Sequence, residues 1–213
     1  GIITKYRKEF KTPRILVRGV FMTYKKKICL EKSMITSTSN QQMKNLMLLM
    51  KKAKARNEQE LFVVEGRKMF QEVPKEWLKQ VYVSESFFAE NDKMLAGYTY
   101  EIVSDSVFKA VSDTQTPQGI LCLVRKPQYR LEELLKGADT HLLILESLQD
   151  PGNLGTMLRT GEGAGISGVV MNHTTVDLFN PKTIRSTMGS IYRMPFFVTR
   201  DLAETICELK NAG

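Results

Sequence analysis

The sequence predicts an α/β protein of two successive units, a small N-terminal α/β domain followed by a domain with an open parallel sheet. Short apolar runs alternate with stretches of helical periodicity over residues 43–127, and the alternation resumes at His141. Leu142–Leu145 is an unbroken apolar run, which is typical of a central parallel strand buried on both faces. A chain of 213 residues is long enough for two such domains, each with its own core.

The first domain is predicted over residues 43–127, after a basic tail or leader over residues 1–42 that we expect to be poorly ordered. A helix is expected over Met43–Lys54, because apolar residues recur there at i, i+3, i+4 and i+7. These apolar positions are Leu46, Leu49, Met50 and Ala53. Four short strands are predicted to follow, at residues 61–64, 81–83, 100–103 and 119–124.

Residues 128–139 are expected to form a linker with one or two helical turns, and residues 140–213 a second, partial domain. Its strands are predicted at residues 142–145, 168–171 and 196–198, with helices between and after them. The last helix, near Leu202–Leu209, has no following strand to return to. Three strands make a small parallel sheet, so we expect the chain to stop within this domain.

Charge is spread unevenly along the chain, whose net charge is +8. Residues 1–60 hold 15 Lys and Arg against 4 Asp and Glu, whereas the remaining residues hold 16 against 19. A basic segment on a nearly neutral body favours a polyanionic partner, of which nucleic acid is the commonest. A solvated surplus of lysine explains the charge alone equally well.

Composition argues against several other classes of protein. The cysteines, Cys29, Cys122 and Cys207, lie far apart, which indicates free thiols in a reducing compartment, and we expect a cytoplasmic protein. The two histidines and the lack of a CxxC pair argue against a zinc site, so no metal is expected. No apolar run approaches the ~18 residues of a membrane span, so no membrane partner is expected.

The stretch Leu142–Gly165 is the most informative part of the sequence. Its predicted strand runs into a turn at residues 150–153, and loops at this end of parallel strands are where open α/β sheets bind ligands. Asn153 is expected to cap the helix that follows, with its side-chain oxygen accepting a backbone N–H. The buried face of this helix is predicted to carry Leu154, Met157 and Leu158.

A second face of the same helix carries Gly155, Arg159 and Gly163, at i, i+4 and i+8. Glycine inside a helix costs about 0.5–1 kcal/mol relative to alanine. Glycines one turn before and one turn after the arginine therefore indicate a close approach, either by another helix or by a ligand phosphate that the guanidinium holds. An ordinary surface arginine is the plain alternative. Gly161–Gly165 is no dinucleotide fingerprint, because it closes a helix instead of opening one.

A second informative stretch runs from Asn180 to Val198. Asn180 is expected to cap a helix that begins at Pro181. The buried stripe is predicted to be Ile184, Met188 and Ile191. The opposite face is predicted to carry Lys182, Arg185, Ser186 and Gly189. Two cations, a hydroxyl and a glycine on one face suit a sugar-phosphate chain, although a solvated basic face accounts for the same pattern.

Together the two stretches resemble the SpoU family of RNA ribose methyltransferases, a branch of the knotted SPOUT superfamily. The first resembles the family motif DPxNxGxxxRT through Asp150, Pro151, Asn153, Gly155, Arg159 and Thr160. The second resembles the segment K-x-x-R-x-S-x-G-[AS], before a strand that opens with Pro195, through Lys182, Arg185, Ser186, Gly189 and Ser190. The N-terminal domain is similar to the family's substrate-binding domain at residues 62–66 and 116–120, so the resemblance covers about residues 43–213.

The resemblance implies a Rossmann-like SPOUT domain that transfers a methyl group from S-adenosylmethionine to a ribose 2′-hydroxyl of RNA. Ribosomal RNA is favoured over transfer RNA, and the complete protein is expected to be a homodimer. The resemblance also implies that Arg159 is catalytic, with Asn153 as its partner. Because a guanidinium with a pKa above ~12 rarely gives up its proton, we assign Arg159 to the phosphate and the developing alkoxide.

Contacts to RNA are expected from cations and hydroxyls of both domains, namely Lys182, Arg185, Ser186, Ser190, Lys51, Lys52 and Arg56. The alternative reading is an RNA-binding protein that uses the same basic surfaces without chemistry. A nucleotide-dependent oxidoreductase is a weaker alternative, since the glycines lie at the wrong end of their helix.

The family's later motifs, a glycine-rich N/G-x-E-G loop and an I-P-M…S-L-N segment, form the knot and hold most of the cofactor. Neither motif occurs in the 213 residues, so the cofactor-binding residues are expected mostly beyond Gly213 and the chain as given is expected to be inactive. Calorimetry on residues 1–213 should therefore show no appreciable binding of S-adenosylmethionine. Tight binding in that measurement would contradict the expectation.

Overall fold

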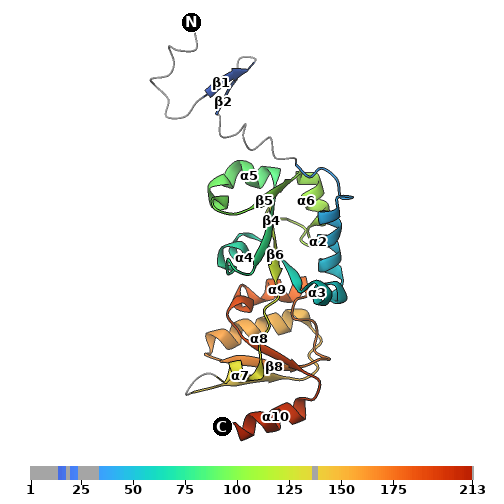
Figure 1. The fold of residues 1–213 in the computed structure, drawn as a ribbon, viewed down its shortest axis with the longest axis vertical. Helices are drawn as coiled ribbons and strands as arrows, with labels where there is room; N and C mark the ends of the chain where they lie inside the picture. The colour runs from blue at the N-terminus through green and yellow to red at the C-terminus, as the bar shows by residue number, and fades with distance from the viewer. Residues whose placement is uncertain (1–13, 18–19, 24–33, 136–138, 213) are drawn as a thin grey trace.

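The computed structural model describes residues 14–17, 20–23, 34–135 and 139–212. Figure 1 shows its two larger sheets one after the other along the long axis of the molecule, with the helix α9 between them. No helix within the described ranges is long and apolar enough to cross a membrane. Most of the predicted basic tail lies outside the described residues, so its expected lack of order is not addressed by the structure.

The N-terminal sheet is mixed and has the strand order β3-β6-β4-β5. Its strands are β3 (Leu61–Glu65), β4 (Leu78–Ser84), β5 (Tyr100–Val103) and β6 (Ile120–Arg125). β6 pairs antiparallel with both β3 and β4, whereas β5 runs parallel to β4. All four predicted strands are therefore present, with β4 beginning three residues earlier than predicted.

Helices cover both faces of this sheet. They are α2 (Gln41–Lys51), α3 (Ala53–Gln59), α4 (Arg67–Glu72), α5 (Glu85–Asn91), the 3₁₀ helix η1 (Asp92–Leu95) and α6 (Asp105–Val111). Phe62 and Val64 of β3 point into a core shared with α4 and α5, whereas Val63 points into a core shared with α2 and α6. The helix predicted over Met43–Lys54 is divided in two, because Lys52 adopts an extended conformation between α2 and α3.

The described N-terminal domain begins before the predicted boundary at Met43. The backbone N–H of Ile35 donates to the carbonyl oxygen of Ile102 at 2.8 Å, and its carbonyl accepts from the N–H of Ser104 at 2.9 Å. The Ile35 side chain is buried in the core that α2 and α6 share. Residues 34–42 therefore belong to the domain and not to the tail.

Two further strands lie upstream, where the sequence pattern predicts none. β1 (Arg14–Val17) and β2 (Val20–Thr23) pair antiparallel, with Val17 opposite Val20. Two short apolar runs separated by two residues, one of them glycine, are the usual signal of a hairpin. Residues 14–23 carry this signal, but the many lysines and arginines around them led to the prediction of a basic tail.

The second sheet consists of β7 (Leu142–Leu145), β8 (Gly168–Asn172) and β9 (Phe196–Thr199), all parallel and in that order. The three predicted strands are confirmed. The prediction that the first of them is central is wrong, because β7 lies at the edge of the described sheet and Ile144 is 37% exposed. β8 is the central strand, and its Val169 and Val170 are fully buried.

The helices of this domain are α7 (Leu131–Leu134), α8 (Pro151–Gly163), α9 (Pro181–Thr187), the 3₁₀ helix η2 (Ser190–Tyr192) and α10 (Leu202–Asn211). Figure 1 shows α8 and α10 on opposite sides of the sheet. α7 is a helical turn within the described part of the predicted linker, and its Leu134 packs where a side chain at Gly168 would otherwise stand. Because Gly168 of β8 has no side chain, Leu134 of the linker can pack directly against the sheet.

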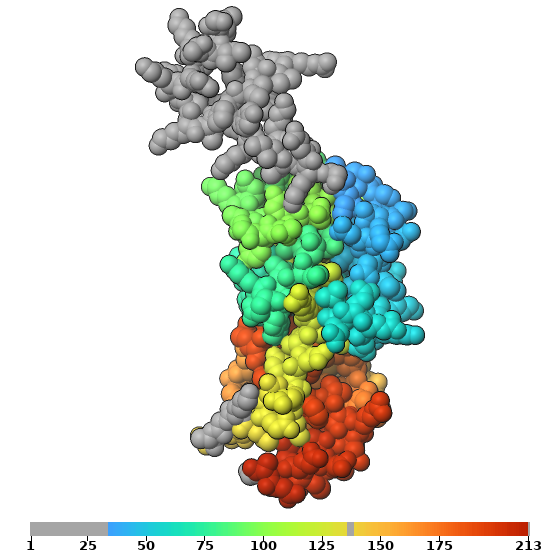
Figure 2. All heavy atoms as spheres, viewed as in Figure 1, coloured from blue at the N-terminus to red at the C-terminus, as the bar shows by residue number. Residues whose placement is uncertain are grey.

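Extensive packing joins the two domains. One apolar core continues from Phe70 in the first domain to Leu154 and Ile184 in the second. An ion pair also crosses the boundary: Arg56 of α3, which is 3% exposed, donates to Oδ2 of Asp177 at 2.5 and 2.8 Å. Figure 2 shows the domains in continuous contact, with the yellow segment around residues 125–135 lying along both.

Replacing Arg56 by methionine should lower the free energy of unfolding by about 3 kcal/mol, because the carboxylate of Asp177 loses its partner in a largely buried pair. Lys54→Met is the matched control, since Lys54 pairs with Glu58 on the surface at 3.7 Å. The control should change stability by less than about 0.5 kcal/mol. Urea denaturation measures both, and equal effects would contradict a structural role for the Arg56 pair.

Candidate functional site

The start of α8 is capped by Asp150, and the predicted cap at Asn153 is wrong. The Asp150 carboxylate accepts the backbone N–H of Asn153 at 2.6 Å, and Pro151 occupies the first turn, where its lack of an N–H is harmless. Both residue types cap helices well, so the proline decides the position of the helix start. Asn153 instead stands in the first turn with its side chain exposed.

α8 and α9 approach each other closely at Gly155. A Cβ atom at this position would lie 2.5 Å from Cβ of Ser186 and 2.5 Å from the carbonyl oxygen of Thr183. The sequence left two explanations for the glycines of α8, a neighbouring helix or a ligand phosphate. At Gly155 the structure shows a neighbouring helix. Gly163 has no such neighbour, since nothing described lies within 4 Å of a Cβ built there.

α9 begins as predicted, with Asn180 accepting the backbone N–H of Lys182 at 2.9 Å and Pro181 in the first turn. The Lys182 ammonium lies 3.8 Å from Oδ2 of Asp150, so the first turns of α8 and α9 are neighbours. The hydroxyl of Ser186 donates to the carbonyl of Lys182 at 2.9 Å, and its Cβ contacts the Gly155 face. Lys182 and Ser186 therefore stand together beside α8.

The predicted single face of Lys182, Arg185, Ser186 and Gly189 is divided, because α9 ends at Thr187 and Met188 turns into the left-handed region at φ 52°. Arg185 points toward the N-terminal domain and pairs with Asp113 at 2.7 Å. Ser190 belongs to η2 and is fully buried, with its hydroxyl donating to the carbonyl of Thr187 at 2.9 Å. The RNA contact predicted for Ser190 is therefore wrong.

The buried stripes of both helices are only partly as predicted. Leu154, Leu158, Ile184 and Ile191 are all at most 1% exposed. Met157 and Met188, by contrast, are 38% and 41% exposed, so neither belongs to the core. Helical spacing assigned both methionines to the buried side because they are apolar. Met157 lies on α8 but is not turned into the core, and Met188 follows the end of α9, where helical spacing no longer applies.

Arg159 is exposed on α8 and makes no hydrogen bond or ion pair with any residue in the described ranges. It stands one turn after Gly155, so it projects from the side of α8 that is nearer to α9. Its guanidinium is therefore available to a ligand. Asn153 is six residues earlier, which places it about 120° around the helix, and no hydrogen bond joins the two within these residues.

The residues of the first domain that were predicted to contact RNA differ in how exposed they are. Lys51 and Lys52 are exposed at the end of α2. Arg56 is buried, and besides its ion pair with Asp177 it donates to the carbonyl oxygen of Met50 at 3.2 Å. A role for Arg56 in RNA binding is wrong for this structure, because its donors are turned inward to close the domain boundary.

Several polar groups at the boundary between the two domains were not predicted from the sequence. Arg193 donates hydrogen bonds to Glu72 of α4 and Glu162 of α8, and both carboxylates raise the pKa of its guanidinium above the ordinary value. Glu65 at the end of β3 accepts hydrogen bonds from the hydroxyls of Ser112 and Thr114. These partners lie 31 to 121 residues apart, so spacing along the chain gives no signal of them.

The residues at the carboxyl ends of β7 and β8 do not fit a cofactor on their own. Oδ1 of Asn172 accepts from the N–H of Ser147 and the hydroxyl of Thr175, both at 2.8 Å. The Gln149 amide donates to the carbonyls of Ser147 and Thr174, so these polar groups are bound to one another. Among the described residues, no three His, Cys, Asp or Glu side chains gather as metal ligands would.

Comparison with known proteins gives a match for each half of the chain. Residues 40–122 match the model of the MRM3-like substrate binding domain, and residues 140–213 match the SpoU rRNA Methylase family. The chain is 35% identical over 181 residues to the 23S rRNA (guanosine(2553)-2′-O)-methyltransferase RlmP of Bacillus subtilis (strain 168). That match covers 84% of this chain and 70% of the relative.

Two further proteins are similar over much of the chain. The human rRNA methyltransferase 3, mitochondrial, is 34% identical over 173 residues, covering 73% of this chain and 39% of the relative. The crystal structure of the AdoMet-bound rRNA methyltransferase from Sinorhizobium meliloti shares the fold with a TM-score of 0.71. It is 24% identical, and the match covers 84% of this chain and 69% of that structure. The chain therefore spans 39% to 70% of the lengths of these three proteins.

The two glycines of α8 should respond oppositely to alanine. Gly155→Ala should destabilise the fold by about 1–3 kcal/mol, because the added methyl group would collide with α9. Gly163→Ala should stabilise it by up to about 1 kcal/mol, because the space there is open and alanine favours the helix. Thermal denaturation distinguishes the two, and similar shifts for both variants would contradict the close helix contact.

Proposed function

The chain belongs to the SpoU rRNA methylase family, and from this premise we propose that the complete protein methylates a ribose 2′-hydroxyl of ribosomal RNA with S-adenosylmethionine as methyl donor. The observation that carries the proposal is the exposed Arg159 guanidinium, which no described residue engages and which stands on the side of α8 nearer to α9. Ribosomal RNA is proposed because the bacterial and human relatives are both named as rRNA methyltransferases.

In this proposal Arg159 binds the phosphate next to the target ribose and stabilises the alkoxide that develops as the hydroxyl loses its proton. A guanidinium suits this task, because its planar donors match two phosphate oxygens at once. Lys182, whose side chain is 60% exposed, and Ser186 extend the same surface from α8 onto α9. Holding the ribose in line with the methyl donor accounts for several kcal/mol of the barrier reduction.

Other predicted residues receive narrower roles. Asn153 would act on the substrate from the first turn of α8, and not through a direct contact with Arg159. Lys51 and Lys52 supply long-range attraction to phosphates, which is strongest at low salt. Arg185 remains a proposed contact at the domain boundary. We further propose a homodimer in the cytoplasm, and the free thiols of Cys122 and Cys207 are compatible with a reducing compartment.

An RNA-binding protein without catalysis is the second candidate. It is favoured by one observation, that the polar groups at the ends of β7 and β8 are bound to one another and leave few donors or acceptors for a nucleoside. The two candidates share every proposed RNA contact. They differ only in whether the complete protein transfers a methyl group.

Deletion of the complete gene should remove ribose methylation at a defined nucleotide of ribosomal RNA, and re-expression should restore it. Re-expressed Arg159→Ala should lower methylation by roughly 100-fold or more, by analogy with the loss of one donor to a developing oxyanion. Arg200→Ala, at an exposed arginine after β9, is the control and should restore methylation fully.

An unchanged methylation map after deletion would contradict the enzymatic proposal and favour the binding protein. Methylation that persists in Arg159→Ala would instead contradict only the catalytic assignment. Sequencing-based mapping of ribose methylation in RNA from the same cells reads out both results.

A further inference from the structure

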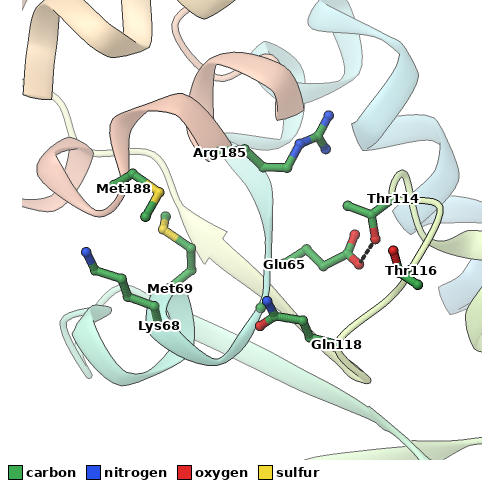
Figure 3. A pocket seen from close by; sticks show the side chains of 9 residues that line it. Glu65, Lys68, Met69, Thr114, Thr116, Gln118, Arg185 and Met188 are labelled. Atoms are coloured by element: carbon green, nitrogen blue, oxygen red, sulfur yellow. Dashed lines mark hydrogen bonds between the residues drawn. The ribbon is translucent and has the colours of Figure 1, made fainter.

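A cavity of about 240 Å³ lies between the N-terminal domain and the end of α9. Figure 3 shows that its walls come from three separate parts of the chain: the junction of β3 and α4, the loop before β6, and α9 with the turn after it. The volume is below the roughly 300–1,000 Å³ typical of drug-sized ligands, so it suits one flat ring system. None of the roles proposed above uses this cavity as a binding site.

Glu65 gives the cavity an acceptor. Its Oε1 atom accepts from the hydroxyls of Ser112 at 2.7 Å and Thr114 at 2.6 Å, which fixes the carboxylate. Its Oε2 atom is buried and has no hydrogen-bond partner among the described residues. Buried polar atoms are nearly always paired, so an orphaned carboxylate oxygen on the wall of a cavity points to a ligand with N–H or O–H donors.

Two methionines provide an apolar surface for a ring. Met69 comes from α4 and is buried, whereas Met188 follows α9 and is 41% exposed. Figure 3 shows their side chains side by side on the wall of the cavity away from Thr114 and Thr116. Thioethers pack well against the faces and edges of aromatic rings, and their flexibility lets them adapt to a ring that enters.

Cations and an amide complete the lining. Lys68 and Arg185 line the cavity from opposite domains, and each side chain is more than a third exposed. Oε1 of Gln118 accepts the backbone N–H of Arg67 at 2.9 Å, which leaves the N–H groups of the amide as donors. The lining therefore combines one acceptor, one amide donor, an apolar wall and two positive charges.

We propose that this cavity receives one unstacked guanine base of the RNA, with Oε2 of Glu65 accepting from both N1–H and the 2-amino group. Guanine is the base whose Watson–Crick edge presents two neighbouring N–H donors with a carbonyl oxygen beside them. Adenine presents a ring acceptor where guanine has N1–H, and a carboxylate repels it. Single-stranded bases that leave the stack are the usual targets of sequence-specific RNA recognition. Lys68 and Arg185, although each pairs with a carboxylate, would attract the phosphates that flank the base.

The location fits the proposed function, on which this inference rests because it takes RNA as the ligand. Arg185 and Met188 are at α9 and the turn after it, and Ser186 of the same helix contacts α8, which carries Arg159. A base in the cavity would therefore anchor the RNA backbone across α9, near the surface proposed for methylation. The anchored base need not be the nucleotide that is methylated.

The test measures binding of residues 1–213 to fluorescent single-stranded RNA heptamers by anisotropy. The heptamers are oligoadenylate with guanine, inosine or adenine at the centre. The guanine heptamer should bind roughly tenfold tighter than the adenine one, which is the discrimination expected when two hydrogen bonds to the base are lost. Inosine, which lacks the 2-amino group, should bind with intermediate affinity.

Glu65→Gln should reduce the preference for guanine to less than about twofold, because the guanine heptamer loses its acceptor and the adenine heptamer is no longer repelled. Glu76→Gln removes an exposed carboxylate of the same domain and should keep the full preference. Glu65→Gln could also disturb the hydrogen bonds from Ser112 and Thr114. Met188→Ala is therefore a second variant, which leaves these hydrogen bonds in place. It should weaken binding of the guanine heptamer severalfold, because the base loses part of its apolar wall.

Equal binding of the three heptamers by the unmodified chain would overturn the guanine pocket while leaving RNA binding intact. A preference that survives in both Glu65→Gln and Met188→Ala would overturn it as well, since guanine would then be read elsewhere. Failure of the chain to bind any heptamer would overturn the pocket and the proposed RNA contacts together.

Discussion

The close contact between α8 and α9 is the constraint on which the rest of the structure depends. It exists because Gly155 has no Cβ, so the backbone of α9 can approach α8 within the space of one methyl group. The contact places Lys182 beside the cap of α8 and leaves Arg159 one turn further along the same side. The other side of α9 packs against the N-terminal domain through Ile184 and Arg185, so one helix of seven residues serves two interfaces.

Electrostatics at the domain boundary distinguish the cations that carboxylates hold from one that no described carboxylate engages. Arg56, Arg185 and Arg193 each pair with a carboxylate that lies 31 to 121 residues away in the chain. These pairs hold the two domains in one orientation, and the most buried of them removes Arg56 from the surface altogether. Arg159 differs, because it is exposed and no described carboxylate engages it. A positive charge in the sequence is thus a candidate for RNA binding only after its acidic partners are known.

Local sequence patterns predicted the positions of most strands and helices, but not which of their residues are buried or which elements they pack against. Strands β3 to β9 and the start of α9 follow from apolar runs and caps, which are properties of neighbouring residues. The edge position of β7 depends instead on which strands pair, and the burial of Ser190 depends on where α9 ends. Asp150 and Asn153 are both good caps, and only the helix start at Pro151 distinguishes them. Sequence spacing was enough to predict Arg159 and Lys182 as site residues. It could not predict the cavity at Glu65, because the walls of this cavity come together only in the folded chain.

The fixed orientation of the domains has a consequence for the kind of RNA that the protein can accept. Tyr192 donates to the carbonyl of Met69 at 3.0 Å and the ion pairs add further links, so the distance between the first domain and α8 is set before RNA arrives. A continuous A-form helix hides its base edges in a deep groove and cannot place one base in a cavity between domains. In the proposed binding mode the substrate therefore supplies an unpaired segment that bends to the protein. Under this proposal, the fixed placement of the two domains by Gly155 and the boundary pairs would select RNA by its shape.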